Sequence, residues 1–162
     1  MLLAASRALL TTTPLLRTTP VSSRSSLQRY LRTMSSSSLK HTSTPNAPAA
    51  IGPYSQAVVA NGLVYTSGCL AFDSNMKLHT GSIADQTRLA LKNLEAVLKA
   101  SGSSLDKVIK TTVFLKNMDD FKEMNGAYAE VFGDARPARS TVEVARLPAD
   151  ANVEIEAIGL VN

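Results

Sequence analysis

Apolar and polar residues alternate along the chain between residues 136 and 160, with the two-residue period of β-strands. The alternation predicts two strands joined by a connection over residues 147–152. One face should be apolar and pack against helices. It carries Ser140, Val142, Val144, Val153, Ile155 and Ala157. The other face is expected to be polar and to place an arginine close to carboxylates. It carries Arg139, Thr141, Glu143, Glu154 and Glu156.

Arg139 on this polar face has two interpretations. If the face is solvated, its charges pair weakly, and each exposed pair contributes about 0–1 kcal/mol. If another subunit covers the face, Arg139 becomes a buried cation for an acidic ligand, because a planar guanidinium matches both oxygens of a carboxylate. The pattern alone leaves both interpretations open.

A β-hairpin is predicted nearer the start of the chain. Asn61 and Gly62 separate two short apolar stretches, residues 57–60 and 63–67, and this pair suits the positive backbone angles of a tight turn. The preceding segment, residues 45–56, has three prolines. It should therefore be an extended lead-in and not a helix.

Three residues at the ends of this hairpin are candidates for a ligand site. The lead-in brings Tyr54 to the mouth of the first strand. Ser67 and Gly68 end the second strand, where a glycine would let a small ligand approach the backbone closely. A β-bulge at Gly68 is the structural alternative.

Two helices are predicted between the hairpin and the C-terminal strands. Ser82 and Asp85 fit a capping box that begins the first helix, and Gly102 ends it. The second helix should run from about residue 119 or 120 to residue 132 and be capped by Gly133. A β-branched stretch between the helices predicts a central strand.

Asn125 falls on the inward stripe of the second predicted helix, four residues after Phe121. A buried amide must have hydrogen-bond partners. It is therefore expected either to bond to neighbouring backbone, or to reach a ligand or orient a residue that does.

The predicted order is strand, strand, helix, strand, helix, strand, strand. This order indicates an α+β fold, with two helices on one face of a mixed sheet. The other face of the sheet would be unburied within one chain. Trimerisation or another closed association would cover it.

The charges indicate a leader and a folded part of different character. Residues 1–40 carry six basic residues and no acidic ones, whereas residues 41–162 carry 11 basic and 13 acidic residues, a net charge of −2. The Arg-rich, Ser/Thr-rich leader is typical of a mitochondrial transit peptide that directs a protein to the matrix, with a disordered tail as the alternative. Initiation at Met34 would give a cytosolic form.

The early apolar run is too short for a membrane span, and the folded part lacks the basic excess expected for nucleic-acid binding.

Cysteine and histidine are scarce. Cys69 is the single cysteine, and the two histidines, His41 and His79, lie in separate polar stretches. This inventory argues against a metal cage, and against a nucleophile activated by histidine. Cys69 is expected to fill space in the core.

Four segments resemble the RidA family, also called YjgF, and the resemblance spans residues 46–161. They are NAPAAIGPYSQAV, VYTSG, KTTVFLKNMDDF followed by Asn125, and PARSTVEVARLPADANVEIEAI. The resemblance implies a chorismate-mutase-like α+β fold over residues 45–162 and a homotrimer with ligand sites in clefts between subunits. It also implies hydrolysis of 2-iminobutanoate and 2-iminopropanoate to 2-keto acids and ammonia, without a cofactor or a metal.

The resemblance also implies roles for individual residues. Arg139 would bind the substrate carboxylate, and Glu154 would be associated with the water that attacks the imine carbon. The remaining substrate-binding residues would be Tyr54, Ser67, Gly68, Asn125 and Thr141. Thr141 stands where many members have a reactive cysteine, and Cys69 stands where many have glutamine. Thiol chemistry at position 141 is therefore not expected, whereas hydrolysis by water remains open.

The imines of this family arise through 2-aminocrotonate and 2-aminoacrylate, which pyridoxal-phosphate enzymes release from threonine and serine. The resemblance thus implies protection of such enzymes and support of branched-chain amino acid metabolism. Two other classes stay open. One is a ribonuclease or translation inhibitor, proposed for relatives, and the other is a non-catalytic carboxylate-binding or chaperone-like module.

Overall fold

The computed structural model describes residues 39–161, which form a mixed sheet with two helices. The strands are β1 (Lys40–Thr42), β2 (Ala57–Ala60), β3 (Leu63–Thr66), β4 (Cys69–Leu70), β5 (Val108–Leu115), β6 (Ala138–Glu143) and β7 (Val153–Leu160). The helices are α2 (Ile83–Ala100) and α3 (Phe121–Phe132), with short 3-10 turns η1 (Leu105–Lys107), η2 (Met118–Asp120) and η3 (Pro148–Asp150).

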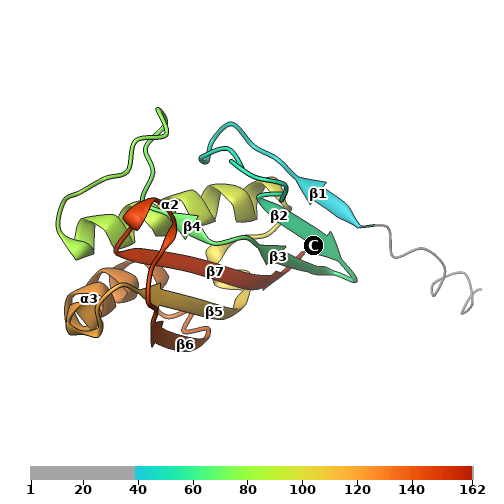
Figure 1. Cartoon of the computed structure of the whole chain (residues 1–162). Helices are drawn as coiled ribbons and strands as arrows, with labels where there is room; N and C mark the ends of the chain where they lie inside the picture. The colour runs from blue at the N-terminus through green and yellow to red at the C-terminus, as the bar shows by residue number, and fades with distance from the viewer. Residues whose placement is uncertain (1–38, 162) are drawn as a thin grey trace, which may run out of the picture. The chain divides into compact units, whose positions relative to one another are not determined.

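The sheet has the order β1-β2-β3-β7-β5-β6, and β4 also pairs with β7 (Figure 1). All neighbours are antiparallel except β5 and β6, which are parallel and are linked through α3. The last strand of the chain therefore lies in the middle of the sheet, between β3 and β5. The α+β prediction of a mixed sheet with two helices on one face is confirmed.

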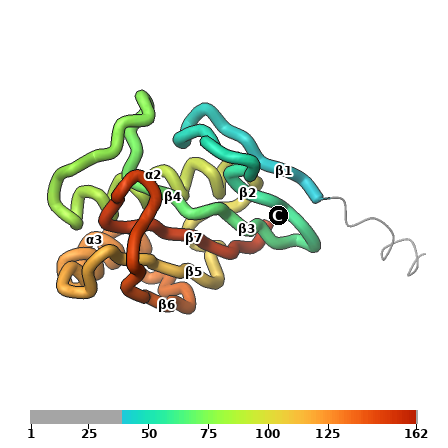
Figure 2. Tube along the Cα trace, in the orientation of Figure 1, coloured from blue at the N-terminus to red at the C-terminus, as the bar shows by residue number. Residues whose placement is uncertain are grey.

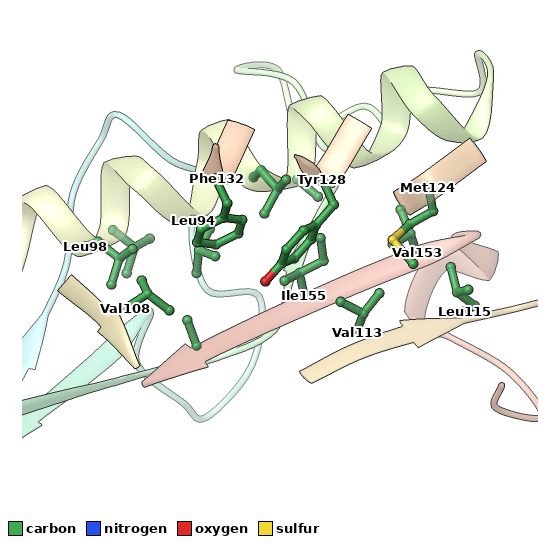
Figure 3. Packing of buried hydrophobic residues seen from close by; sticks show 14 of the residues in the cluster. Leu94, Leu98, Val108, Val113, Leu115, Met124, Tyr128, Phe132, Val153 and Ile155 are labelled. Carbon is green, nitrogen blue, oxygen red and sulfur yellow. The ribbon is translucent and has the colours of Figure 1, made fainter. Parts of the chain in front are cut away.

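The hydrophobic core lies between the helices and one face of the sheet (Figure 3). Residues at helical spacing on α2 and α3 meet every second residue of β5 and β7, as the two periodicities require. The members with 0% exposure are Val64, Ala90, Leu91, Leu94, Leu98, Val113, Leu115, Met124, Val153 and Ile155.

Local turn and cap signals fix several boundaries as predicted. Asn61 (φ 52°) and Gly62 (φ 77°) both have positive φ and close the β2–β3 hairpin. Ser82 caps α2, because its hydroxyl oxygen accepts from the Asp85 backbone N–H at 3.1 Å. Gly133 ends α3 with a φ of 51°.

The two faces of β6 are the reverse of the sequence prediction. In the parallel β5–β6 ladder, Arg139 lies beside Thr111 and Thr141 lies beside Val113, and both β5 residues are fully buried under the helices. Arg139 and Thr141 therefore face the helices, whereas Val142 is 42% exposed on the other face. The physical reason is that β6 is an edge strand, where the inward face needs fewer apolar side chains than in the centre.

The sequence analysis did not anticipate β1, which pairs with β2 at the end of the sheet opposite β6 (Figure 2). The Thr42 hydroxyl is buried and lies 2.9 Å from the hydroxyl of Ser101 at the end of α2. Residues 1–38, which hold most of the predicted leader and Met34, lie outside the described residues. Within residues 39–161, neither helix has the length and the apolar run needed to cross a bilayer.

Candidate functional site

A cavity of about 90 Å³ opens beside the start of β7, and it gathers four of the residues predicted for the site. These are Tyr54, Ser67, Gly68 and Glu154. Apolar side chains form much of the rest of its wall. They include Ile51 of the lead-in, Leu70 of β4, Phe72 just after β4, and Val97 of α2. Residues from distant parts of the sequence meet here because β4 pairs with β7.

Hydrogen bonds to the lead-in hold Ser67 at the mouth of this cavity. Its backbone N–H donates to the Gln56 carbonyl at 3.0 Å, and its hydroxyl donates to the Ser55 carbonyl at 2.6 Å. Gly68, the next residue, lies against the carboxyl group of Glu154, and a Cβ at this position would overlap that group. A side chain at position 68 would therefore displace the carboxyl group of Glu154, while the backbone angle of Gly68 itself needs no glycine.

Gln56 belongs to this site, although the sequence analysis did not single it out. Its side-chain oxygen accepts from the backbone N–H of Thr44 at 2.6 Å, and its amide donates to the carbonyls of Thr44, Ala47 and Pro48 at 3.1, 3.3 and 2.7 Å. The residue is buried, and it lines the cavity. A buried glutamine amid prolines is the signal that could have identified it, because residues 44–48 have no strand or helix to satisfy their backbone groups.

Glu154 is a half-buried acid with a raised pKa. Desolvation by burial is the main cause, and the negative charge of Glu156 on the same strand adds to it. An acid of this kind holds its proton more readily than an exposed glutamate and is suited to proton transfer. Burial, with a further contribution from Glu154, raises the pKa of the Cys69 thiol to about 12. Cys69 is therefore a neutral thiol at physiological pH, in agreement with the space-filling role expected for it.

The other predicted site residues gather on β6 and α3. The Arg139 guanidinium carbon lies 4.5 Å from the ring centroid of Tyr128 and 5.8 Å from that of Phe121. Within residues 39–161, the Arg139 guanidinium makes no hydrogen bond or ion pair, although the backbone of Arg139 belongs to the β5–β6 ladder. Its in-plane N–H donors are thus available to a ligand.

Two more of the predicted site residues, Thr141 on β6 and Asn125 on α3, also have unused hydrogen-bonding capacity. The Thr141 hydroxyl is buried and has no hydrogen-bond partner in the described part of the chain. Asn125, half-buried on α3, has no hydrogen bond from its amide there either, so the expected bond to neighbouring backbone is not formed. Buried polar groups are normally satisfied. Arg139 and Thr141, which share one face of β6, therefore have the character of an incomplete binding site.

The sheet separates the two groups of site residues. Glu154 alternates with the buried residues Val153 and Ile155 on β7, so it points away from the helices, whereas Arg139 points towards them. The prediction that Arg139 shares a face with Glu154 and Glu156 is therefore wrong for a single chain. The sequence pattern could not show this, because β5 lies between β6 and β7 and sets the faces of both.

Metal-ligating side chains do not cluster in residues 39–161, where no group of three His, Cys, Asp or Glu residues is placed to hold an ion.

Comparison with known proteins identifies the family. The model of the family described as Endoribonuclease L-PSP matches residues 44–161. The chain belongs to the RidA, or YjgF, family. It is 55% identical over 122 residues to the RutC family protein UK114 of Drosophila melanogaster, covering 75% of this chain and 88% of the fly protein. It is 46% identical over 128 residues to the 2-iminobutanoate/2-iminopropanoate deaminase of Mus musculus, covering 78% and 95%.

Solved structures of the RidA family share the fold. The crystal structure of E. coli TdcF with bound serine matches with a TM-score of 0.72 and 39% identity, covering 76% of this chain and 99% of TdcF. The chorismate-mutase-like fold expected from the sequence is thereby confirmed. Both groups of site residues lie inside the matched region of this RidA protein, and the whole predicted leader, residues 1–40, lies before it.

Proposed function

We propose that the protein is an enamine/imine deaminase that hydrolyses 2-imino acids, such as 2-iminobutanoate and 2-iminopropanoate, to 2-keto acids and ammonia. The observation that carries this proposal is the unpaired guanidinium of Arg139, which shares the inner face of β6 with the unsatisfied hydroxyl of Thr141. A half-buried cation without a partner is a site for an anion. The substrate carboxylate is an anion of the right size for a bidentate contact.

Glu154 would handle water and protons at the imine carbon. A protonated imine is already an electrophile, so the carboxylate needs only to accept a proton as water adds and then return it to nitrogen. The resulting carbinolamine loses its hydroxyl proton and expels ammonia, and the net reaction converts an iminium ion and water to a ketone and ammonium. The raised pKa of Glu154 supports this role, because general acid–base catalysis works best when the pKa approaches the ambient pH.

The two groups of residues would meet between subunits. Because the sheet separates Arg139 from Glu154 in one chain, a complete site needs Arg139 from one copy and Glu154 from another. The uncovered sheet face bears exposed apolar side chains, including Tyr65 (44% exposed) and Val142 (42%), which favours a covered face in the assembled protein. A homotrimer is the closed assembly we propose.

The names of relatives support the substrate class. The mouse and human relatives are named 2-iminobutanoate/2-iminopropanoate deaminase, the TdcF structure holds serine, and a relative from Arabidopsis thaliana is named Reactive Intermediate Deaminase A. Serine and the two imino acids are small and carry a carboxylate next to the nitrogen-bearing carbon. A shared subsite for that carboxylate is consistent with the role proposed for Arg139.

In the cell, the deaminase would remove reactive imines released by pyridoxal-phosphate enzymes and would support branched-chain amino acid metabolism. We place it in the mitochondrial matrix on the composition of residues 1–40, with a cytosolic form if translation starts at Met34. Fusion of residues 1–40 to a fluorescent protein tests the proposed localisation to mitochondria. Fluorescence confined to the cytosol would contradict it.

The family description also names a ribonuclease. The net charge of −2 over residues 41–162 does not favour a phosphate-binding surface. RNA cleavage that survives purification and is lost with Arg139→Ala would support a nuclease. Binding of carboxylates without turnover of imine would support a non-catalytic module.

A coupled assay tests the deaminase directly. Threonine dehydratase generates 2-iminobutanoate in situ, and the release of 2-oxobutanoate and ammonia is compared with the uncatalysed background. Arg139→Ala removes the guanidinium that would pair with the substrate carboxylate. This loss should cost about 2–5 kcal/mol of transition-state binding, or about 30-fold or more in kcat/KM. Wild-type activity equal to background, or a fully active Arg139→Ala, would overturn the assignment.

A further inference from the structure

Tyr128 is buried on the inner face of α3 and is joined to two residues that are neighbours on the sheet below it. Its ring lies 4.5 Å from the guanidinium carbon of Arg139, and its hydroxyl lies 2.7 Å from the hydroxyl of Thr111. Thr111 and Arg139 are partners in the β5–β6 ladder. One side chain thus links the helix to two adjacent strands.

We propose that Tyr128 is a positioning residue that holds the Arg139 guanidinium ready for the substrate carboxylate. This inference rests on the proposed function, in which Arg139 binds that carboxylate. Arginine has several rotatable bonds, and fixing it before binding lowers the entropy cost of forming the contact.

An aromatic ring suits this task better than an acidic partner. A ring contacts the flat face of the guanidinium and leaves the N–H donors in its plane free, whereas a carboxylate would occupy those same donors. Arg139 has no ion-pair partner in the described part of the chain, and Tyr128 is the nearer of its two aromatic neighbours. The cation is therefore held without being neutralised.

Thr111 and Phe132 keep the ring itself in place. Thr111 is fully buried, and its hydrogen bond fixes the outer end of Tyr128, whose hydroxyl points towards the sheet (Figure 3). Phe132 stacks on the same ring with centroids 4.5 Å apart. Desolvation raises the pKa of Tyr128, against smaller lowering effects of the Thr111 hydrogen bond and the Arg139 charge, so the ring remains a neutral phenol at physiological pH. The neutral Tyr128 hydroxyl therefore does not compete with the substrate carboxylate for Arg139.

The test measures binding of 2-oxobutanoate, which keeps the carboxylate of the substrate, by titration calorimetry, together with kcat and KM in the coupled assay. Tyr128→Leu removes the ring, and we expect Kd and KM to rise about three- to thirty-fold, the range of a cation–π contact, with a smaller change in kcat. Tyr128→Phe keeps the ring but loses the Thr111 hydrogen bond, and we expect a smaller rise.

A matched control separates positioning from general loss of stability. Leu98→Ala removes a fully buried side chain of the same core from α2, whereas both rings against Arg139 belong to α3. It should lower the urea midpoint without changing Kd for 2-oxobutanoate. In an Arg139→Ala background, Tyr128→Leu should cause no further loss of kcat/KM, because its effect acts through the arginine.

The possible failures are distinguishable. If Tyr128→Leu binds 2-oxobutanoate as tightly as Leu98→Ala does, or weakens kcat/KM equally with and without Arg139, the positioning role is wrong. If Arg139→Ala itself binds 2-oxobutanoate normally, the proposed function fails, whatever Tyr128 does.

Discussion

Gly68 lies so close to the carboxyl group of Glu154 that no side chain fits between them. Gly68→Ala should therefore push the carboxyl group out of its place. The main-chain angle of Gly68 is not in the left-handed region, so the fold should tolerate alanine there. We expect imine hydrolysis to fall about 10²-fold or more, the contribution of a well-placed acid or base, while the urea midpoint changes little.

Gly126 provides the control for this substitution. It lies on α3, and a Cβ there would meet nothing within 4 Å. Gly126→Ala should keep activity and stabilise the protein by up to about 1 kcal/mol, because alanine favours the helix. Full activity of Gly68→Ala would show that the position of Glu154 does not matter for the reaction.

Local signals in the sequence were sufficient for most of the fold. Asn61 and Gly62 predicted the hairpin, Ser82 and Gly133 predicted helix ends, and the two periodicities predicted which elements form the core. These signals work because they depend on a few adjacent residues. The N-terminal strand β1 carries no such signal, since its three residues become a strand only by pairing with β2.

The arrangement of the site residues could not be predicted from the alternation pattern alone. The alternation of β6 correctly separated Arg139 from Val142, but polarity suggested the wrong direction for each. Which face turns inward depends on the β5 partner, and that partner is set by the whole topology. Polarity misleads at this edge strand, where an arginine and a threonine face inward because the inner face at the edge of the sheet needs fewer apolar side chains.

The raised pKa of Glu154 makes a prediction about stability. A carboxyl whose pKa is higher in the folded state stabilises the fold while it is protonated, and that contribution is lost as pH rises from about 4 through the folded pKa. Glu154→Gln, which stays neutral, should therefore raise the urea midpoint relative to wild type at pH 7, and the difference should shrink towards pH 4. The same variant should lose activity.

The opposite result for Glu154→Gln would have a definite meaning. A variant less stable than wild type at pH 7 would show that the ionised carboxylate is stabilised by a cation that the single chain does not place beside it. Glu156→Gln is the control, because removing the neighbouring charge should lower the pKa of Glu154 and keep its carboxyl group.

Gln56 should be important for both the fold and the cavity. Gln56→Ala leaves the backbone groups of residues 44–48 without their partners, and one such buried group costs about 1–3 kcal/mol. We expect a lower urea midpoint and a higher KM for the imine. Gln86→Ala removes another buried glutamine, whose amide donates to the Gly81 carbonyl at 2.8 Å away from the cavity. It should lower stability without raising KM, and equal KM values for the two variants would contradict this prediction.

The strand β1 should contribute to stability although it lies before the region matched by the family model. A chain that starts at residue 44 loses three ladder pairs and the buried Thr42 hydroxyl, and it should be less stable by at least about 1 kcal/mol than a chain that starts at residue 39. Thr42→Val should cost less than this truncation, because Ser101 keeps its bond to the Val97 carbonyl at 2.9 Å. Equal urea midpoints for the two chains would show that β1 adds nothing.

Mixing two inactive variants tests whether the active site is shared between subunits. Arg139→Ala retains Glu154, and Glu154→Gln retains Arg139. If each site takes one residue from each of two neighbouring subunits of a closed ring, random co-assembly of equal amounts restores about one half times one half, or about a quarter, of the sites. Unfolding and refolding the two variants together should then recover about a quarter of wild-type activity, whereas mixing them without exchange should recover none. No recovery after co-refolding into mixed assemblies, verified with a tag on one variant, would mean that a single chain must supply both residues.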